Sequence, residues 1–245
     1  MSASAQPEPE NKCPDCLFMQ LTGEPLDSKQ WFQQQRVLEK IELKITLNFN
    51  EQWQELPKGR VKFGIRGGEL RLTLTNGKIP YPDRKWNKKF DPSIPRKRQT
   101  KISQKEKGSG KASASSSGDV KAELTGDSEN ISETIDTFPV STAQVTTKGS
   151  EEEPVWAFEA LTGEPILKEN LTQEKLATVT VEKMPCEIRA TFEVAERDLY
   201  FSDAEGVWPS NISRNKRASI ERLLVRWLLK SKLQPYLSRQ RLRYE

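Results

Sequence analysis

The sequence contains no histidine and only three cysteines among its 245 residues. Without an imidazole, Ser-His-Asp triads, Cys-His nucleophiles and histidine-ligated zinc sites are all excluded. The glycine-rich phosphate loops and the nucleophile elbow are missing too, since none of the motifs G-x-x-x-x-G-K-[ST], G-x-G-x-x-G and G-x-S-x-G occurs. We therefore expect a protein that is not an enzyme and has no cofactor.

Apolar residues are also scarce, at 34% hydrophobic against 30% charged residues. Typical soluble domains contain about 45–50% apolar residues, counting glycine, and about 25% charged residues. No run of 18 apolar residues is present that could span a membrane, and the start MSASAQPEPENK has no apolar core of a signal peptide. We expect a soluble, cytoplasmic protein of which only part is folded.

Cys13 and Cys16 form a Cys-Pro-Asp-Cys motif, a spacing that can bind a metal or form a redox couple. A structural zinc requires four ligands, and this chain offers at most three thiols and no imidazole. We interpret the pair as reduced thiols at the mouth of a domain and expect no metal. A thiol redox or zinc function is the least favoured alternative. Cys186 lies in an alternating pattern and is expected in a core.

Two sets of residues recur along the chain. Leu-Thr-Gly-Glu-Pro at 21–25 recurs at 161–165, with a phenylalanine three positions before each copy. A second set recurs at an offset of 129 residues: Phe63 with Phe192, Ile65 with Val194, Leu70 with Leu199, Gly77 with Gly206, and Pro80 with Pro209. The order is preserved, and the two offsets differ by a single shortening of eleven residues. This pattern predicts an internal duplication.

Each copy contains alternating segments that predict half-buried strands. The clearest alternation covers nine residues of the first copy: Ile41, Leu43, Ile45, Leu47 and Phe49. It follows a short helix expected from Asp27 or Ser28 to about Glu39. A second alternation from Val61 to Leu74 is interrupted by Gly67-Gly68, which we interpret as a hairpin turn.

The second copy alternates from Cys186 to Val194 and is followed by a predicted basic C-terminal helix that should end before Pro235. Apolar residues at helical spacing define one face of this helix: Ile220, Leu223, Leu224, Trp227 and Leu228. We expect this face to pack on the second sheet. Docking to a partner or to a membrane surface is the alternative.

Together these patterns predict an α+β fold of two related antiparallel β-meander units, each with a short helix, plus the basic C-terminal helix. The expected parts are a disordered leader with the Cys-x-x-Cys motif at 1–16, a first repeat at 17–95, a disordered polyampholyte linker at 96–153, and a second repeat with the C-terminal helix at 154–245. The linker is rich in Ser, Thr, Lys and Glu, and it cannot bury enough apolar surface to offset its ordering entropy.

Charge is segregated along the chain, although the net charge is only +4. The stretches from Arg84 to Lys107 and from Arg214 to Glu245 each contain ten basic and two acidic residues. The stretch from Asp119 to Glu153 contains nine acidic and two basic residues. Two strongly basic blocks in one chain indicate an anionic partner.

Cations neutralise phosphates and release counterions, and aromatic residues among them can stack on unpaired bases. We expect a non-enzymatic binding module for nucleic acid, either RNA or single-stranded DNA, or for another anionic surface. The expected contact residues are Arg84, Lys85, Trp86, Lys88, Lys89, Arg96, Lys97, Arg98, Arg222, Arg226, Lys230 and Lys232. The alternative is a protein assembly or scaffold factor that binds a protein partner at an exposed sheet face.

Overall fold

The computed structural model describes residues 8–26, 40–86, 96–100, 134–138, 143–161, 165–209, 211–226 and 230–245. The chain divides into two units, one formed by Met1–Asp91 with Ser141–Glu245 and the other by Pro92–Val140. In the second unit, β8 (Arg96–Thr100) pairs with β9 (Thr134–Phe138) in an antiparallel sheet of two strands.

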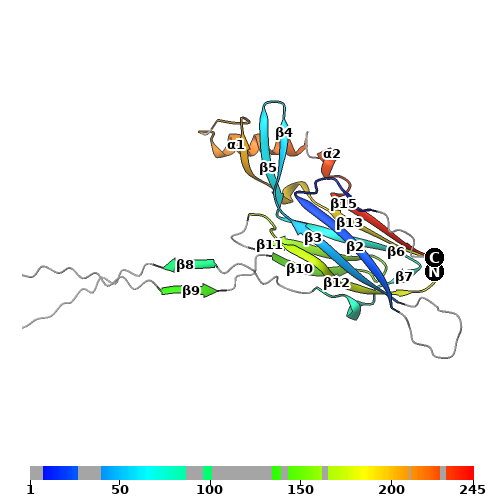
Figure 1. The fold of residues 1–245 in the computed structure, drawn as a ribbon. Coiled ribbons are helices and arrows are strands. Elements are labelled where there is room, and N and C mark those ends of the chain that lie inside the picture. Colours follow the sequence, from blue (N-terminus) through cyan, green and yellow to red (C-terminus); the bar gives the residue numbers. More distant parts are fainter. Residues whose placement is uncertain are drawn as a thin grey trace, which may run out of the picture. The chain divides into compact units, whose positions relative to one another are not determined.

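The largest sheet has six strands, in which all neighbours are antiparallel. Its spatial order is β1 (Glu10–Asn11), β15 (Ser238–Tyr244), β13 (Cys186–Glu193), β6 (Gly67–Thr75), β11 (Pro154–Ala160) and β10 (Ala143–Gly149). A second sheet has the order β2 (Leu17–Leu26), β3 (Lys40–Phe49), β12 (Asn170–Val181) and β7 (Gly77–Lys78). Figure 1 shows both sheets.

A third sheet consists of β14 (Leu199–Glu205), β5 (Gly59–Ile65) and β4 (Gln52–Leu56), and it extends away from the other two sheets (Figure 1). The helical segments are η1 (Tyr81–Asp83), η2 (Glu196–Asp198), α1 (Arg214–Leu224) and α2 (Lys230–Leu233). The first unit is therefore mostly antiparallel sheet with one longer α-helix, as the predicted antiparallel strands require. The two predicted repeats do not form separate meanders, because β6 of the first lies between β13 and β11 of the second. No helix among the described residues is long and apolar enough to cross a membrane.

Alternating apolar residues of the six-stranded and four-stranded sheets form one core between them. The alternating set predicted from Ile41 to Phe49 is buried at every second position of β3, as expected. The ring of Phe49 on β3 lies 5.5 Å from that of Phe158 on β11 and 5.6 Å from that of Phe192 on β13. These aromatic contacts join the two sheets. Cys186 is buried in the same core, as predicted.

Gly67-Gly68 does not form the predicted hairpin turn. The chain passes from β5 through Arg66 into β6, and the two strands pair with different partners, β14 and β13. The reason for a glycine here is close packing, because a Cβ at Gly68 would lie 2.4 Å from Cε1 of Phe192. The two glycines mark a tightly packed crossing between two sheets, a role that glycine shares with turns.

Parts of the predicted leader and linker are ordered strands. Glu10 and Asn11 form β1 on the edge of β15, and Asn11 exchanges two side-chain hydrogen bonds with the backbone of Met19. Within the predicted linker, residues 143–149 form β10, which pairs with β11 along its whole length. These two segments of low hydrophobicity are ordered because they pair with the edges of the sheet, β1 with β15 and β10 with β11. The predicted helix at 27–39 lies outside the described residues.

The C-terminal helix differs from its prediction in how it packs. α1 ends at Leu224, α2 ends before Pro235, and none of the residues of α1 is buried. Leu223 is 54% exposed, and Ile220 and Leu224 are only half-buried. Leu224 packs against the edge of the core, whereas Leu223 faces solvent, so the described part of the stripe contacts the core only partly. Trp227 and Leu228 lie outside the described residues.

Candidate nucleic-acid interface

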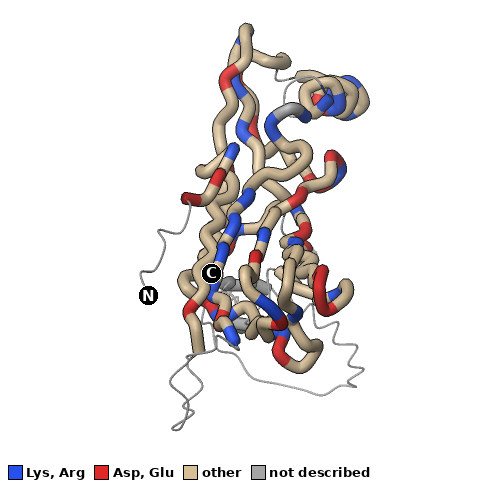
Figure 2. The backbone as a smooth tube through the Cα atoms, turned by 90° about the vertical axis from the view of Figure 1, so that its right-hand side faces the viewer, with Lys and Arg blue, Asp and Glu red and all other residues tan. Residues whose placement is uncertain are grey.

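A groove of about 780 Å³ runs between α1 on one side and η2 with β14 on the other. Six arginines and two glutamates line it, together with Tyr200 and four apolar residues. The arginines are Arg66, Arg197, Arg214, Arg217, Arg222 and Arg226. Their six positive charges exceed the two negative charges of Glu196 and Glu221 by four. Figure 2 shows how Lys and Arg gather on the helix beside this groove. We call it the arginine groove.

Helical spacing brings four of these arginines to one side of α1 and the residues after it. Arg217 follows Arg214 by three residues, Arg222 follows Arg214 by eight, and Arg226 follows Arg222 by four, and all four arginines line the side of the helix that borders the groove. Arg217 attaches this face of α1 to β14 and to Trp208. Its Nε lies 2.7 Å from Oε1 of Glu221, its Nη2 donates to the carbonyl of Phe201, and its guanidinium lies 5.2 Å from the ring centre of Trp208.

Arg66 reaches the groove from the crossing between β5 and β6. Its backbone N–H donates to the carbonyl of Asp198 over 2.6 Å, and its own carbonyl accepts a hydrogen bond from the N–H of Ala160 over 2.7 Å. Its guanidinium lies over the ring of Tyr200, 5.8 Å from the centroid. The backbone of Arg66 is held on both sides, while its exposed side chain extends into the groove.

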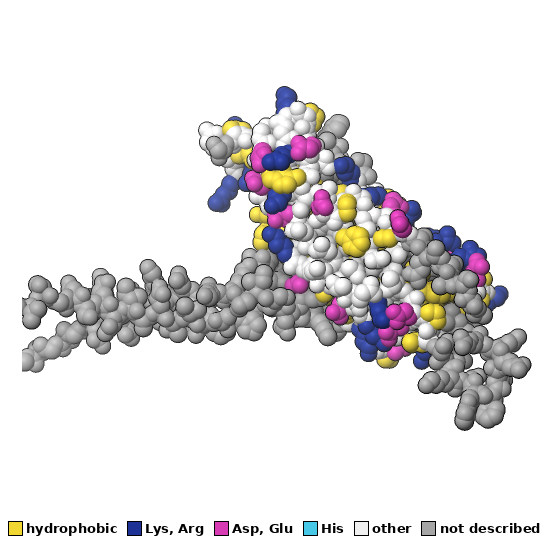
Figure 3. All heavy atoms as spheres, in the orientation of Figure 1, with side chains coloured by type: hydrophobic (Ala, Val, Ile, Leu, Met, Phe, Trp, Pro, Cys, Tyr) yellow, Lys and Arg dark blue, Asp and Glu magenta, His cyan; other side chains and the backbone are white. Residues whose placement is uncertain are grey.

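The arginines of the groove differ in their pairing from those on the outer face of the six-stranded sheet. Within the described residues, Arg66, Arg214, Arg222 and Arg226 make no ion pair with a carboxylate. On the sheet, by contrast, Arg239 pairs with Glu10 at 2.7 Å, and Arg241 pairs with Glu187. A similar mixture of opposite charges covers the face shown in Figure 3. Among the described residues, the groove thus brings together several arginines that no carboxylate pairs with.

Among the residues expected from the sequence, Arg222 and Arg226 line the arginine groove. Lys230 and Lys232 are exposed on α2 and do not line it. Lys232 donates a hydrogen bond to Oε1 of Gln54 over 2.5 Å, and Nζ of Lys230 lies 3.8 Å from a carboxylate oxygen of Glu196. Both lysines are on α2, and their side chains already contact Gln54 on β4 and Glu196 on η2.

Arg84 and Trp86 have structural contacts that differ from the expected role. The guanidinium of Arg84 donates to the carbonyls of Lys148, Gly149 and Ser150 and lies over the ring of Tyr81. Trp86 is only 8% exposed, and its ring meets that of Phe158 edge-on at 6.0 Å. The apolar indole fills the core, so its face is not open to a base. We therefore do not expect Trp86 to contact nucleic acid.

The remaining expected residues are placed as follows. The side chain of Lys85 is exposed. Its backbone N–H donates a hydrogen bond to the carbonyl of Leu176, and its own carbonyl accepts one from the indole N–H of Trp156. Lys88 and Lys89 lie outside the described residues. Arg96, Lys97 and Arg98 belong to β8 in the second unit, paired with β9. Their role in binding stays a prediction.

The contact residues expected from the sequence omit four of the groove arginines. Arg214 and Arg217 belong to the basic C-terminal block that the sequence did indicate, whereas nothing indicated Arg66 and Arg197. Each is far along the chain from the basic C-terminal block, and neither lies in a cluster of cations. The pairing of β5 with β14 brings both beside α1. Their isolated positions in the sequence gave no signal of a shared site.

Cys13 and Cys16 are fully buried, which differs from the expectation of accessible thiols at the mouth of a domain. The chain turns between them, with the N–H of Cys16 bonded to the carbonyl of Cys13. Burial raises the pKa of both thiols, and the neighbouring Glu51 raises that of Cys16 further. Within the described part of the chain, no group of three or more cysteine or carboxylate side chains is placed to hold a metal ion.

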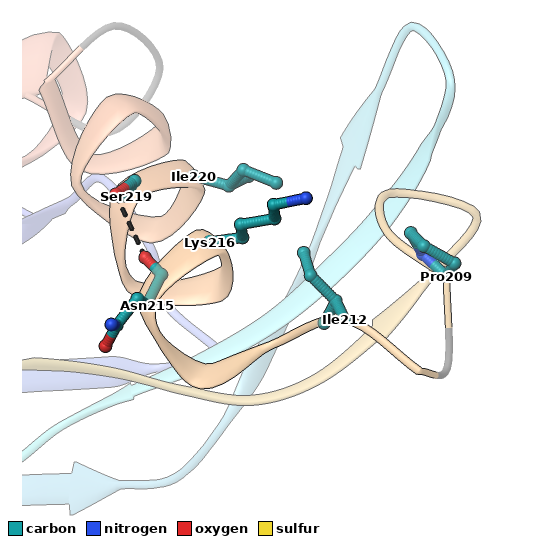
Figure 4. A pocket seen from close by; sticks show the side chains of 6 residues that line it. All are labelled: Pro209, Ile212, Asn215, Lys216, Ser219 and Ile220. Carbon is teal, nitrogen blue, oxygen red and sulfur yellow. Dashed lines mark hydrogen bonds between the residues drawn. The ribbon is translucent and has the colours of Figure 1, made fainter.

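A smaller groove of about 520 Å³ lies on another side of α1 (Figure 4). Pro209, Ile212 and Ile220 give it an apolar lining, and the stem of Lys216 crosses it (Figure 4). This groove lacks the arginines of the first. The helix therefore separates a cationic groove from an apolar one.

A scan of protein-family models finds none that matches this chain, and a comparison with curated proteins finds no significant relative.

Proposed function

We propose that this protein is a non-enzymatic binding module that holds single-stranded nucleic acid, RNA or DNA, in the arginine groove. The observation that supports this proposal is the set of groove arginines without carboxylate partners in the described structure: Arg66, Arg214, Arg222 and Arg226. Arginine guanidinium groups form two parallel hydrogen bonds with phosphate oxygens. A row of them along one groove suits a chain of phosphates better than a single small anion.

Tyr200 adds an aromatic surface to the same groove. Its ring is half-buried and already carries the guanidinium of Arg66. A base of a single strand can stack on such a surface, while its phosphates contact the arginines on α1. In a duplex, stacking between neighbouring base pairs covers the faces of the bases. The combination therefore favours a single strand.

A salt titration tests this function. Binding of a 12-nucleotide RNA or DNA strand, followed by fluorescence anisotropy, should weaken steeply with added salt because counterions are released. The double variant Arg222→Gln/Arg226→Gln should lower the salt slope by about 1.4, at about 0.7 for each lost contact with a phosphate. The matched control is Arg239→Gln/Arg241→Gln, which removes the same charge from arginines that already pair with glutamates.

The control variant should bind with nearly the slope of the unaltered protein. An equal loss in both double variants would mean that net charge alone attracts the strand, and the groove would not be the site. Failure of the unaltered protein to bind either nucleic acid at physiological salt would overturn the proposed function.

The basic stretch from Arg84 to Lys107 is proposed as a second source of phosphate contacts. The variant Lys88→Gln/Lys89→Gln/Lys97→Gln/Arg98→Gln should then lower the salt slope in addition to the groove variant. An unchanged slope would remove this stretch from the interface.

The second candidate is a protein assembly factor, favoured by the apolar groove at Pro209, Ile212 and Ile220. Binding to an apolar protein surface changes little with salt, unlike binding to phosphates. Ile220→Gln should weaken such binding and, since it leaves the charge of α1 unchanged, should not alter the affinity for nucleic acid. A partner captured in high salt and lost in this variant would support assembly instead.

We also infer that the chain arose by internal duplication. The sequence match makes β5 equivalent to β13 and β6 equivalent to β14. β6 pairs with β13 and β14 pairs with β5, so exchanging the two copies turns one pair into the other. This reciprocal pairing supports the duplication. The Leu-Thr-Gly-Glu-Pro copies do not add to it, because β2 pairs with β3 whereas β11, just before the second copy, pairs with β6 and β10.

A further inference from the structure

A hollow of about 430 Å³ on the outer face of the six-stranded sheet adjoins the arginine groove. Arg66 and Arg197 line both spaces. A nucleic-acid strand whose phosphates lie in the groove therefore passes directly beside the hollow.

Small residues form part of the hollow's lining. Gly67 lies opposite Glu159 in the pairing of β6 with β11, and Ala157 lies opposite Glu69. Gly67, Gly68 and Ala157 all line the hollow. The carbonyl of Phe158 and the ring of Phe192 occupy the places where a Cβ of Gly67 or Gly68 would lie, so the room for a planar ring comes from the small methyl group of Ala157.

Three carboxylates, those of Glu69, Glu159 and Asp198, line the hollow together with Arg66, Arg197, Gln144 and Thr146. Glu69 is already bonded to Arg71 and Lys148. Glu159 is exposed and has no ion pair within the described residues, and the amide of Gln144 lies opposite it on β10. Oδ1 of Asp198 lies 3.9 Å from Nε of Arg197; burial raises the pKa of Asp198, while the charge of Arg197 lowers it. Glu159 and Asp198 both line the hollow.

We propose that the hollow binds a nucleobase with an exocyclic amino group, such as cytosine, and rejects uracil and thymine. This inference rests on the proposed function. The amino group of cytosine donates a hydrogen bond to a carboxylate, whereas uracil presents a carbonyl oxygen at the same position. Two oxygens facing each other repel, so the acceptors at Glu159 and Asp198 discriminate against uracil. The flat guanidinium of Arg66 provides a surface on which the base stacks.

The experiment compares 12-nucleotide strands of cytidine and of uridine at pH 7.5. These bases differ at the position that the carboxylates read, so the ratio of the two dissociation constants isolates that contact. We expect cytidine strands to bind about tenfold more tightly. Glu159→Gln should bring the ratio close to one, because the amide both donates and accepts. Ala157→Leu should do the same by filling the hollow.

Two matched controls accompany these variants. Glu174→Gln removes an exposed carboxylate from β12 in the other sheet, and Thr73→Leu adds an apolar side chain at an exposed position of β6. Both should keep the tenfold preference.

The outcomes separate this inference from the function on which it rests. Equal affinity for both strands, together with a salt slope that Arg222→Gln/Arg226→Gln lowers, would overturn base reading and leave the groove function intact. Preference for cytidine that survives Glu159→Gln and Ala157→Leu would also overturn the hollow as its source. Absence of binding to either strand would overturn the proposed function and the inference with it.

Discussion

The hydroxyl of Tyr244 donates a hydrogen bond of 3.0 Å to the carbonyl of Gly23 and joins the two large sheets. Tyr244 is on β15 of the six-stranded sheet, and Gly23 is on β2 of the four-stranded sheet. A Cβ at position 23 would lie 2.0 Å from the hydroxyl oxygen and 3.1 Å from Cγ2 of Ile41. The glycine of the first Leu-Thr-Gly-Glu-Pro copy is thus required by packing between the sheets.

The contact between Gly23 and Tyr244 predicts a coupled pair of substitutions. Gly23→Ala should lower the free energy of unfolding by about 1–3 kcal/mol through overpacking. Tyr244→Phe should cost about 1 kcal/mol through the lost hydrogen bond. The double variant should be less destabilised than the sum, since the ring without its oxygen leaves room for the new methyl group. Urea denaturation of the four proteins measures this coupling. Strict additivity would contradict it.

Burial of Trp86 predicts a loss of stability rather than a specific loss of nucleic-acid binding. Trp86→Ala should lower the free energy of unfolding by about 3–5 kcal/mol, as for other large buried aromatic residues. The exposed Leu223 provides the control, because Leu223→Ala should change stability by less than about 0.5 kcal/mol. Urea denaturation measures both. A stable Trp86→Ala protein with weakened binding to single strands would instead restore the indole as a stacking residue.

The buried thiols predict slow chemical modification. Cys13, Cys16 and Cys186 are all fully buried, and burial raises the pKa of each thiol, so few thiolates form at pH 8. A disulfide reagent should label the folded protein far more slowly than the protein in guanidinium chloride, where all three thiols are free. Rapid labelling of two thiols in the folded state would show that the turn at Cys13 opens readily. Zinc bound at one ion per chain would contradict the expectation that Cys13 and Cys16 bind no metal.

Glu51 predicts a dependence of stability on acid pH. Its side chain is 11% exposed and lies 2.9 Å from Nζ of Lys168 and 3.7 Å from Nζ of Lys62. Burial alone raises the pKa of Glu51, but hydrogen bonds from Ser202 and Lys168 and the charges of both lysines outweigh it and lower that pKa below its usual value. The ionised carboxylate therefore stabilises the folded protein above its ordinary pKa of about 4.3.

This contribution is lost as the pH falls through the lowered pKa of the folded state. Glu51→Gln should be less stable than the unaltered protein at pH 7, and the difference should shrink towards zero near pH 3. Glu174→Gln, at an exposed position, is the matched control. Urea denaturation at both pH values measures the effect, and a constant difference between pH 7 and pH 3 would rule out the carboxylate's charge as its cause.

Local patterns in the sequence were enough to identify individual strands. The alternation from Ile41 to Phe49 predicted β3, and the alternation from Cys186 to Val194 predicted β13. Period-two alternation works because successive side chains of a strand point to opposite faces, whatever its partners are. The basic C-terminal block also indicated Arg222 and Arg226 as candidate contacts. These features depend on neighbours in the sequence alone.

Only the tertiary structure decided which strands are neighbours and which side chains are exposed. The passage of the chain through Gly67-Gly68 could not be distinguished from a hairpin turn, because the ring that requires a glycine belongs to Phe192 on another strand. The cations around Trp86 in the sequence favour a stacking role, but its ring is buried against Phe158, a contact that the sequence does not show. The arginine groove itself depends on the pairing of β5 with β14, which brings Arg66 and Arg197 beside α1. Burial and convergence of this kind arise from contacts between distant segments, and no local pattern records them.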